Sequence, residues 1–372
     1  MMPCGPPCID YDALSTGAGH EKVRHALRQG FSSSILVRLP PPLLHILRED
    51  RAQTLAATRA LARADNSTQR EQLRSCRMTC DVPLRKGVSD TRNATFTATT
   101  SLSWRAGVRP TDASWVSEAV ADAPALGALP RLSRLLTHVA ALVARALDAR
   151  LEESVVAAGT CKVRAIHYFA GHHTRWWSRP HFDYGLLTAL TAPAYWGDGA
   201  EDALQDGAEA RAECEGGAGL RALQMGADAP SAPPPSDVPL PIPVDCILVQ
   251  TGEAAQILSG GHVSAGLHGV ARPVDECHGL TERTTLAVFL QPPWTQEMSP
   301  WGEEETEVVL AASPPVGSLA PPLAVRWVRG QTFAEFSKST TAAYYGTGRA
   351  GGATVSPTPS VAAREGARLA AA

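Results

Sequence analysis

The second half of the chain contains several short segments with strand character that follow one another without a helix between them. Residues 162–169 alternate in polarity, and residues 246–250 and 284–290 are largely apolar runs, the last of which ends at a pair of prolines. Runs rich in β-branched and aromatic residues and bounded by Gly and Pro are typical of β-strands. Their density, with no interleaved helices, predicts an antiparallel sandwich or barrel and argues against a sheet of βαβ units.

The first 150 residues have a different texture, in which helical periodicity dominates. Residues 19–29, 43–64 and 132–152 place apolar side chains three and four positions apart, and a short apolar strand at 35–37 follows the first of these segments. Residues 76–115 lack a clear period and are expected to be strand and loop. The pattern predicts a mostly helical N-terminal region that packs on the strand-rich part of the chain.

The expected organisation has four parts. They are the N-terminal region (1–150), the barrel (151–300), a C-terminal segment with a helix (301–345) and a tail (346–372). Residues 197–243 are rich in Gly, Ala, Asp and Pro and are expected to be an insertion that is largely loop. A helix is expected from Phe333 to Tyr345. The last 27 residues contain almost no large apolar side chain, which predicts a disordered tail.

The charge balance excludes one class of partner. The chain has 34 basic and 37 acidic residues, and its formal net charge of −3 provides no basic field for a phosphate backbone. No apolar stretch approaches the ~18 residues of a membrane span, and the first residues lack the features of a secretory signal. The 8 cysteines include two C-x3-C pairs without a second close pair, which favours reduced thiols over a zinc site. These features predict a monomeric cytoplasmic protein without a nucleic-acid or membrane partner.

His181 and Asp183 are the first candidate site residues. Residues two apart in a strand face the same side, so an imidazole and a carboxylate would lie together, although an ordinary surface pair has the same spacing. His268, which follows the apolar run at 246–250, offers a second imidazole. Two imidazoles and one carboxylate on one face form the facial triad that holds non-haem Fe(II) and leaves positions open. Zinc could use the same three ligands.

Arg283 is expected at the start of a strand that runs into the barrel. An arginine inside an apolar barrel is costly unless it meets an anion, and its planar guanidinium suits a carboxylate. Thr285 lies two residues further on, faces the same side and can add a hydroxyl donor. The alternative is an ordinary ion pair on an edge strand.

The order and spacing of these segments resemble the isopenicillin N synthase-like Fe(II)/2-oxoglutarate-dependent dioxygenases. The stretch His181–Thr188, HFDYGLLT, closely resembles the iron-binding H-x-D-x-G-x-L-T strand of that family. Residues 261–270 resemble the segment with its distal histidine, and Arg283–Thr285 occupies the place of its R-x-S motif. Residues 9–37 and 330–345 are similar to its N-terminal region and C-terminal helix. The resemblance covers most of residues 9–345.

The resemblance implies a mainly β fold with α-helices, namely a double-stranded β-helix (jelly-roll) barrel with a helical N-terminal region. The implied activity is Fe(II)- and 2-oxoglutarate-dependent oxidation of a small organic molecule by O2, with release of succinate and CO2. Hydroxylation, desaturation and ring closure are all known in the family. The implied iron ligands are His181, Asp183 and His268, and the implied 2-oxoglutarate-binding residues are Arg283, Thr285 and Tyr168.

The sequence departs from the family pattern at three places near the site, one of which is Thr285 in place of the serine of the R-x-S motif. Gly269 stands where an Arg usually follows the distal histidine, and the interval from His268 to Arg283 is longer than usual. The substrate is expected in the barrel mouth, lined by the N-terminal part, a Trp176-Trp177 loop and the C-terminal helix. Two alternatives stay open: an iron oxidase of the same fold that does not use 2-oxoglutarate, and a non-catalytic small-molecule-binding barrel.

Overall fold

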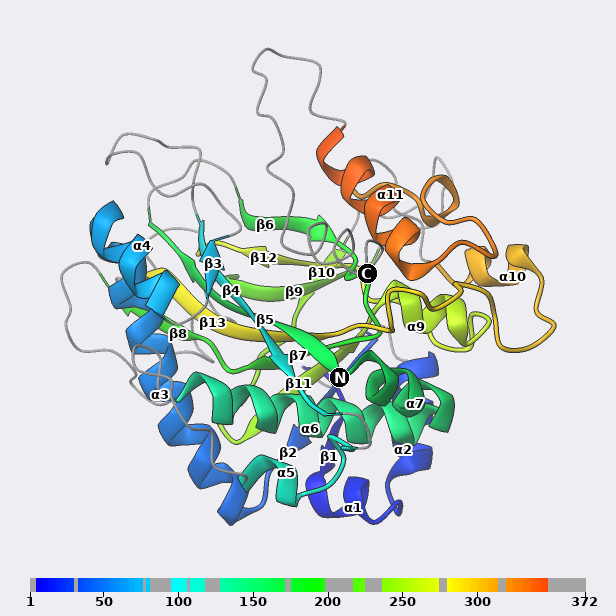
Figure 1. Cartoon of the computed structure of the whole chain (residues 1–372), viewed down its shortest axis with the longest axis horizontal. Helices are drawn as coiled ribbons and strands as arrows, with labels where there is room; N and C mark the ends of the chain where they lie inside the picture. Colours follow the sequence, from blue (N-terminus) through cyan, green and yellow to red (C-terminus); the bar gives the residue numbers. More distant parts are fainter. Residues whose placement is uncertain are drawn as a thin grey trace.

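The computed structural model shows two β-sheets packed face to face, with helices over the outer face of the larger sheet (Figure 1). All statements below concern the residues that the structure describes. These are residues 5–29, 33–75, 78–80, 95–105, 108–117, 128–170, 175–197, 217–224, 236–273, 280–313 and 319–346.

The larger sheet has nine described strands in the order β1-β2-β11-β7-β13-β5-β4-β3, with β8 paired to β13. Only β1 and β2 run parallel, and the other neighbours are antiparallel. The strands are β1 (Cys8–Asp10), β2 (Ser34–Arg38), β3 (Thr79–Cys80), β4 (Thr95–Ser103), β5 (Thr160–Tyr168), β7 (Leu187–Thr191), β8 (Ala194–Gly197), β11 (Cys246–Thr251) and β13 (Leu280–Leu290).

The smaller sheet has four described strands in the antiparallel order β10-β9-β12-β6. Side chains from both sheets meet in one buried cluster, where Leu220 and Ala222 of β9 join Leu190 of β7 and Leu248 of β11. Among the described strands, no pairing joins the two sheets, so an open two-sheet sandwich stands where a closed barrel was expected. The strands are β6 (Trp176–His181), β9 (Gly219–Gln224), β10 (Ser236–Pro239) and β12 (His268–Ala271).

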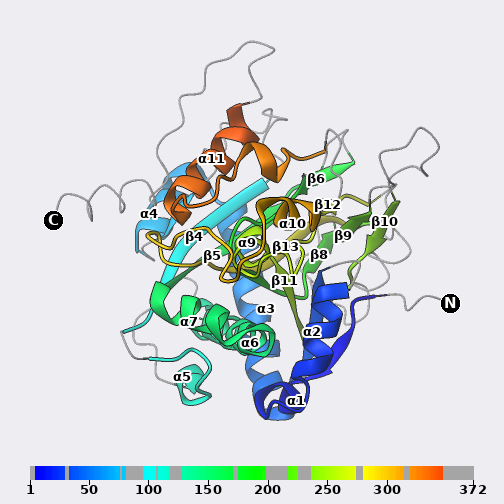
Figure 2. The ribbon, with the colours of Figure 1, turned by 90° about the vertical axis from the view of Figure 1, so that its right-hand side faces the viewer.

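Helices α1–α3 and α5–α7 cover the larger sheet on the side away from the smaller one, whereas α11 lies apart from them, across the sheet from α6 and α7 (Figure 1 and Figure 2). In the described part of the chain, no helix is long and apolar enough to cross a membrane. The helices are α1 (Tyr11–Ser15), α2 (His20–Gln29), α3 (Pro41–Arg63), α4 (Asn66–Ser75), α5 (Ser114–Ser117), α6 (Leu129–Leu147), α7 (Ala149–Ala158), α9 (Glu253–Leu258), α10 (Thr306–Ala311) and α11 (Phe333–Gly346).

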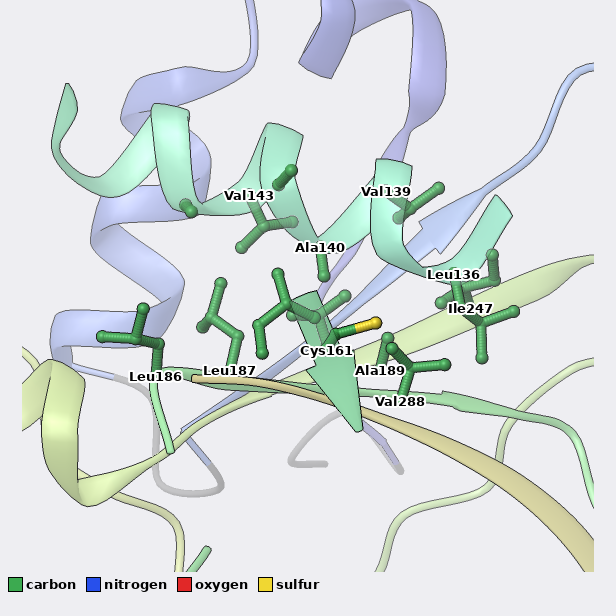
Figure 3. Packing of buried hydrophobic residues seen from close by; sticks show 14 of the residues in the cluster. Leu136, Val139, Ala140, Val143, Cys161, Leu186, Leu187, Ala189, Ile247 and Val288 are labelled. Carbon is green, nitrogen blue, oxygen red and sulfur yellow. The ribbon is translucent and has the colours of Figure 1, made fainter. Parts of the chain in front are cut away.

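Helix α6 forms the centre of the main hydrophobic core. It contacts α2, α3 and α7 as well as the strands β7, β11 and β13. Because neighbours cover it on several sides, most of the residues of α6 are apolar and buried. Leu136 and Val143 lie on the face of α6 that packs on the sheet, above Leu187, Ile247 and Val288 (Figure 3). Burial of such side chains stabilises the fold by roughly 1.5–3 kcal/mol each.

The N-terminal 150 residues contribute strands as well as helices. The expected helices at 19–29 and 43–64 are present as α2 and α3, and the expected strand at 35–37 lies within β2. However, β1, β2 and β4 are members of the larger sheet. The region is therefore built into the sandwich itself, because its strands supply both edges of the larger sheet, β1 and β2 at one and β4 and β3 at the other.

The single helix expected over 132–152 is in fact two helices. Asp148 has extended backbone angles, with φ −162° and ψ 132°, and its side chain accepts a hydrogen bond from the backbone N–H of Arg150 at 2.8 Å. This is the geometry of a helix N-cap, which satisfies one of the free N–H groups at the start of α7. The chain therefore turns between α6 and α7.

The expectation that residues 197–243 are largely loop is wrong for two segments. Residues 219–224 form β9, which pairs with β10 on one side and β12 on the other, so it is an interior strand of the smaller sheet. Residues 236–239 form β10. The rest of that interval, 198–216 and 225–235, and the expected tail at 347–372 lie outside the described residues.

We predict that Leu136→Ala lowers the free energy of unfolding by about 2–5 kcal/mol, because Leu136 is fully buried and its loss leaves a cavity between α6 and the sheet. Urea denaturation monitored by circular dichroism measures the change. Val308→Ala is the matched control, since Val308 is 51% exposed and should change stability by less than about 0.5 kcal/mol. Equal effects of both substitutions would contradict the packing described for α6.

Candidate metal centre

Two imidazoles are brought together by the pairing of β6 with β12. His181 is the last residue of β6 and lies directly opposite His268, the first residue of β12. Opposite residues of an antiparallel pair share one face of the sheet, and the two ring centroids are 4.5 Å apart. The structure therefore confirms that these two histidines, 87 positions apart in the sequence, are neighbours.

Asp183 joins them from a turn, and not from the strand that the sequence suggested. Strand β6 ends at His181, and Asp183 lies two residues beyond it. Its backbone carbonyl accepts a hydrogen bond from the N–H of Glu253 at 2.8 Å, and its Oδ2 accepts one from Thr188 Oγ1 at 2.6 Å. A Cβ atom at Gly252 would lie 2.8 Å from the Asp183 carbonyl oxygen. Glycine is required there for the start of α9 to come this close.

The three side chains converge on one point. His181 Nε2 is 3.9 Å from Asp183 Oδ1, and His268 Nε2 is 3.9 Å from Asp183 Oδ2. One ligand atom from each residue lies within 4.8 Å of the other two, and no other such group occurs among the described residues. We call His181, Asp183 and His268 the triad. Its donor atoms have the separation that suits ligands of a shared metal ion.

The tautomers of both histidines suit a metal ion. The Nδ1 of His181 donates a hydrogen bond to the carbonyl of Arg179 at 2.7 Å, and the Nδ1 of His268 donates one to the carbonyl of Gly266 at 2.9 Å. Because a carbonyl can only accept, each Nδ1 carries the proton and each Nε2 keeps a lone pair. Desolvation and the neighbouring His268 lower the pKa of His181 to about 4, so it is neutral near pH 7 and ready to bind.

Arg283 lies inside the sandwich, as expected. It is 1% exposed and lies opposite Tyr168 in the pairing of β13 with β5. Its guanidinium carbon is 5.5 Å from the ring centre of Tyr168 and 6.0 Å from that of Tyr195. Thr285 follows on the same face, with Oγ1 3.5 Å from the carbonyl of Thr191. Arg283, Thr285 and Tyr168 thus share one inner wall.

Trp176 and Trp177 belong to strand β6 and not to the loop that was expected for them. Trp177 points into the sandwich, where its Nε1 donates to the carbonyl of Phe169 at 2.9 Å and its ring lies 5.5 Å from that of Tyr168. Trp176 covers Gly269, since a Cβ there would lie 2.8 Å from Trp176 Cζ3. This contact explains why Gly replaces the usual Arg after the distal histidine.

A buried ion pair behind Asp183 is a feature that the sequence did not reveal. Glu253 and Arg326 are each 2% exposed, and the guanidinium of Arg326 donates to both carboxylate oxygens of Glu253, at 2.6 Å for the Nη1–Oε2 contact. Arg326 lies 5.6 Å from the ring of Tyr344 in α11, whose hydroxyl accepts a hydrogen bond from the N–H of Phe182 at 3.1 Å. The C-terminal segment is therefore tied to the turn between His181 and Asp183.

The outer faces of β5 and β13 carry a second buried network. Glu282 Oε2 is 3.0 Å from Arg63 Nη2, 3.3 Å from Arg59 Nε and 3.7 Å from His167 Nε2. Burial raises the pKa of Glu282, but hydrogen bonds and charges from His167 and Arg63 outweigh this effect and lower it to about 2. The network fastens α3 to the strand that carries Arg283.

Comparisons with solved structures were made after this geometry was established. AtDAO1, the dioxygenase for auxin oxidation 1 from Arabidopsis thaliana in complex with 2-oxoglutarate, has 17% identity and a TM-score of 0.51, covering 81% of this chain and 98% of its own. A full-length protein from Neurospora crassa in complex with alpha-KG has 16% identity and a TM-score of 0.55, covering 91% and 96%. JOX2 in complex with 2OG, Fe and JA has 17% identity and a TM-score of 0.54, covering 90% and 85%.

These likenesses define the class of fold. No family model and no curated protein matches the sequence. The solved structures nevertheless show that the chain has the fold of the 2-oxoglutarate/Fe(II) oxygenases over most of its length. The resemblance inferred from the motifs is thereby confirmed at the level of the fold.

We predict that Arg326→Met lowers the free energy of unfolding by about 3–5 kcal/mol, because it leaves the carboxylate of Glu253 buried without its cation. Arg329→Met, an exposed change three residues away, is the matched control and should have little effect. Chemical denaturation of both variants measures the difference. A small effect at Arg326 would mean that the ion pair does not hold the C-terminal segment in place.

We predict that the stability contributed by Glu282 disappears in acid. Its pKa is about 2 in the folded protein against 4.5 in its unperturbed state, so the contribution is present above about pH 4.5 and is lost as the pH falls toward 2. The difference in unfolding free energy between the wild type and Glu282→Gln should therefore shrink as the pH falls from about 5 to about 2. Glu303→Gln, a change at an exposed residue, controls for the loss of one carboxylate. If the difference in unfolding free energy between the wild type and Glu282→Gln grew in acid, the lowered pKa of Glu282 would be refuted.

Proposed function

We propose that the protein is an Fe(II)- and 2-oxoglutarate-dependent dioxygenase that oxidises a small organic molecule, with O2 as oxidant and succinate and CO2 as products. The observation that carries this proposal is the convergence of two Nε2 lone pairs and one carboxylate, with both Nδ1 protons already engaged by backbone carbonyls. In the proposal, His181, Asp183 and His268 hold Fe(II) on one face and leave the other coordination positions open.

Arg283 is proposed to bind the distal carboxylate of 2-oxoglutarate. It is a fully buried cation on the inner wall, where a planar guanidinium can meet a carboxylate with two parallel hydrogen bonds. The hydroxyls of Thr285 and Tyr168 lie on the same wall and can donate to the same anion. Burial is the largest effect that raises the pKa of Tyr168, so its hydroxyl keeps its proton.

When bound, Fe(II) and 2-oxoglutarate would supply the redox chemistry that activates O2 for the oxidation of a C–H bond. The chain's own residues hold and shield the site. Thr188 fixes one oxygen of Asp183, while Trp177, Tyr168 and Leu190 close the interior to water. A fixed and dry site aligns one C–H bond of the substrate and limits side reactions. The monomeric state and cytoplasmic location expected from the sequence stay predictions.

Anaerobic addition of Fe(II) and then 2-oxoglutarate to the purified protein tests the proposal. We expect a weak visible metal-to-ligand absorption band that requires both additions and is lost in His181→Ala. Bound iron without the band would favour an oxidase that does not use 2-oxoglutarate. If neither the wild type nor His181→Ala binds iron, only the interpretation as a non-catalytic binding protein is left.

Titration of the same band tests the role of Arg283. We predict that Arg283→Gln weakens 2-oxoglutarate binding at least about tenfold, because a charge-assisted hydrogen bond contributes about 1.5–3 kcal/mol. Iron binding should stay unchanged, since Arg283 is not among the triad. Arg28→Gln, a change on the exposed face of α2, is the matched control for the loss of one positive charge. Unaltered affinity in Arg283→Gln would exclude this residue as the carboxylate partner.

A further inference from the structure

Gln250 in β11 places a carboxamide on the inner wall of the sandwich. Alternate residues of this strand face opposite sides of the sheet. Ile247 packs beneath α6 (Figure 3), whereas Leu248 joins the cluster between the two sheets. Gln250 lies two residues beyond Leu248 and therefore faces the same interior. Its side chain is buried, with only 1% of the residue exposed.

Neither polar atom of this carboxamide has a partner in the part of the chain that the structure describes. Its Oε1 and its Nε2 are both buried and make no hydrogen bond there. A buried amide without hydrogen bonds costs free energy, because it loses its contacts with water and gains none in return. A methionine of similar volume would avoid this cost, so the packing of the fold does not call for a glutamine here.

Gln256 in α9 shows how the same residue type looks where it serves the fold. It is fully buried too, but its Nε2 donates to the carbonyl of Val309 at 2.9 Å and to Ser313 Oγ at 2.7 Å. Its Oε1 accepts from the N–H of Ala265 at 2.8 Å. The contrast indicates that the carboxamide of Gln250 is present for a ligand, since an orphaned buried polar group needs an explanation outside the packing.

Gln250 lies next to the hydroxyl that fixes Asp183. It is directly opposite Thr188 in the pairing of β11 with β7, and such partners share a face with Cβ atoms about 4.5–5.5 Å apart. Thr188 in turn donates to Asp183 Oδ2 at 2.6 Å. Two residues after Gln250, a Cβ atom at Gly252 would lie 2.8 Å from the Asp183 carbonyl oxygen. A group bound by Gln250 therefore lies beside the triad.

The inner wall changes from apolar to polar at the row that contains Gln250. The cross-strand row of Gln250 consists of Ser34, Gln250, Thr188 and Phe289. The next row along the same strands consists of Leu36, Leu248, Leu190 and Ala287. Phe289 and Asp183 are both partly exposed, so solvent reaches the polar row on the side of the triad.

The chemistry of a carboxamide selects its partner. Its Nε2 donates and its Oε1 accepts, side by side. A carboxylate offers acceptors alone and would oppose Oε1, whereas an ammonium offers donors alone and would oppose Nε2. An amide with its C=O and N–H on one edge matches both atoms. The last torsion of glutamine is soft, so the carboxamide can turn toward such a group at low cost.

We propose that Gln250 binds the substrate and that the substrate carries an amide, either a lactam or a primary carboxamide, that pairs with both polar atoms of this side chain. This inference rests on the proposed function and narrows its substrate class to small amides. Gln250 then acts as a specificity residue that orients the substrate beside the triad. It takes no part in oxygen activation.

Matched compounds with and without the N–H test this proposal on the protein loaded anaerobically with Fe(II) and 2-oxoglutarate. The probes are δ-valerolactam against δ-valerolactone, 2-quinolinone against coumarin, and phenylacetamide against phenylacetate. Binding is followed by the change in the visible band and by titration calorimetry, and turnover by O2-dependent succinate release. We expect at least one amide to bind at least about tenfold more tightly than its counterpart, which leaves Oε1 without a donor.

Variants assign the preference to this side chain. Gln250→Met, which removes both polar atoms at similar volume, should abolish the preference for the amide and keep the band formed with 2-oxoglutarate alone. Its midpoint of urea denaturation should equal or exceed that of the wild type, because no hydrogen bond of the fold is lost. Gln256→Met should lower the midpoint, since it breaks three hydrogen bonds. Gln53→Met, an exposed change on α3, is the matched control and should leave the preference intact.

Three results would overturn the proposal. They are no amide preferred over its counterpart by the wild type, a preference that survives in Gln250→Met, and a midpoint of Gln250→Met lowered as far as that of Gln256→Met. The last result would assign Gln250 to the fold. Absence of the visible band in the wild type is a separate failure, that of the proposed function. Calorimetry with the same pairs of compounds scores Gln250 in that case as well.

Discussion

The register between β6 and β12 is the constraint on which the centre of this molecule depends. A shift of one residue in a strand turns every side chain to the other face, so His268 meets His181 in one register only. Gly269 helps to fix that register, because only a residue without a Cβ fits beneath Trp176. The pairing of β12 with β6 is irregular after His268, whereas its pairing with β9 stays in regular register, so His268 and Val270 face the same interior.

The third member of the triad depends on different parts of the chain. Asp183 lies in a turn, where strand pairing cannot hold it, and its position comes from the N–H of Glu253 and the hydroxyl of Thr188. Glu253 is itself held by Arg326, 73 residues away. Residues near the end of the described chain therefore help to fix the orientation of the Asp183 carboxylate near its middle, which couples the packing of the C-terminal segment to the assembly of the triad.

Local patterns were sufficient for some of these features and insufficient for others. Helical periodicity located α2 and α3, and the H-x-D and R-x-T motifs located residues that the structure brings to one interior. The strand β9 was missed because its stability comes from pairing with β10 and β12, while its flanks are rich in Gly and Pro. The ion pair of Glu253 with Arg326 was missed for a similar reason, since buried opposite charges far apart in sequence leave no periodic signal.

The two faces of β5 and β13 separate the residues that hold the strands in place from those to which the proposed function assigns chemistry. On the outer face, Glu282 pairs with Arg59 and Arg63 of α3 and lies beside His167 of β5, whereas the next residue of each strand, Arg283 and Tyr168, faces the interior. Because neighbours in a strand point to opposite sides, anchoring one residue fixes the direction of the other. A buried cation such as Arg283 needs this rigidity, since a flexible strand would let it turn to water and lose its orientation toward an anion.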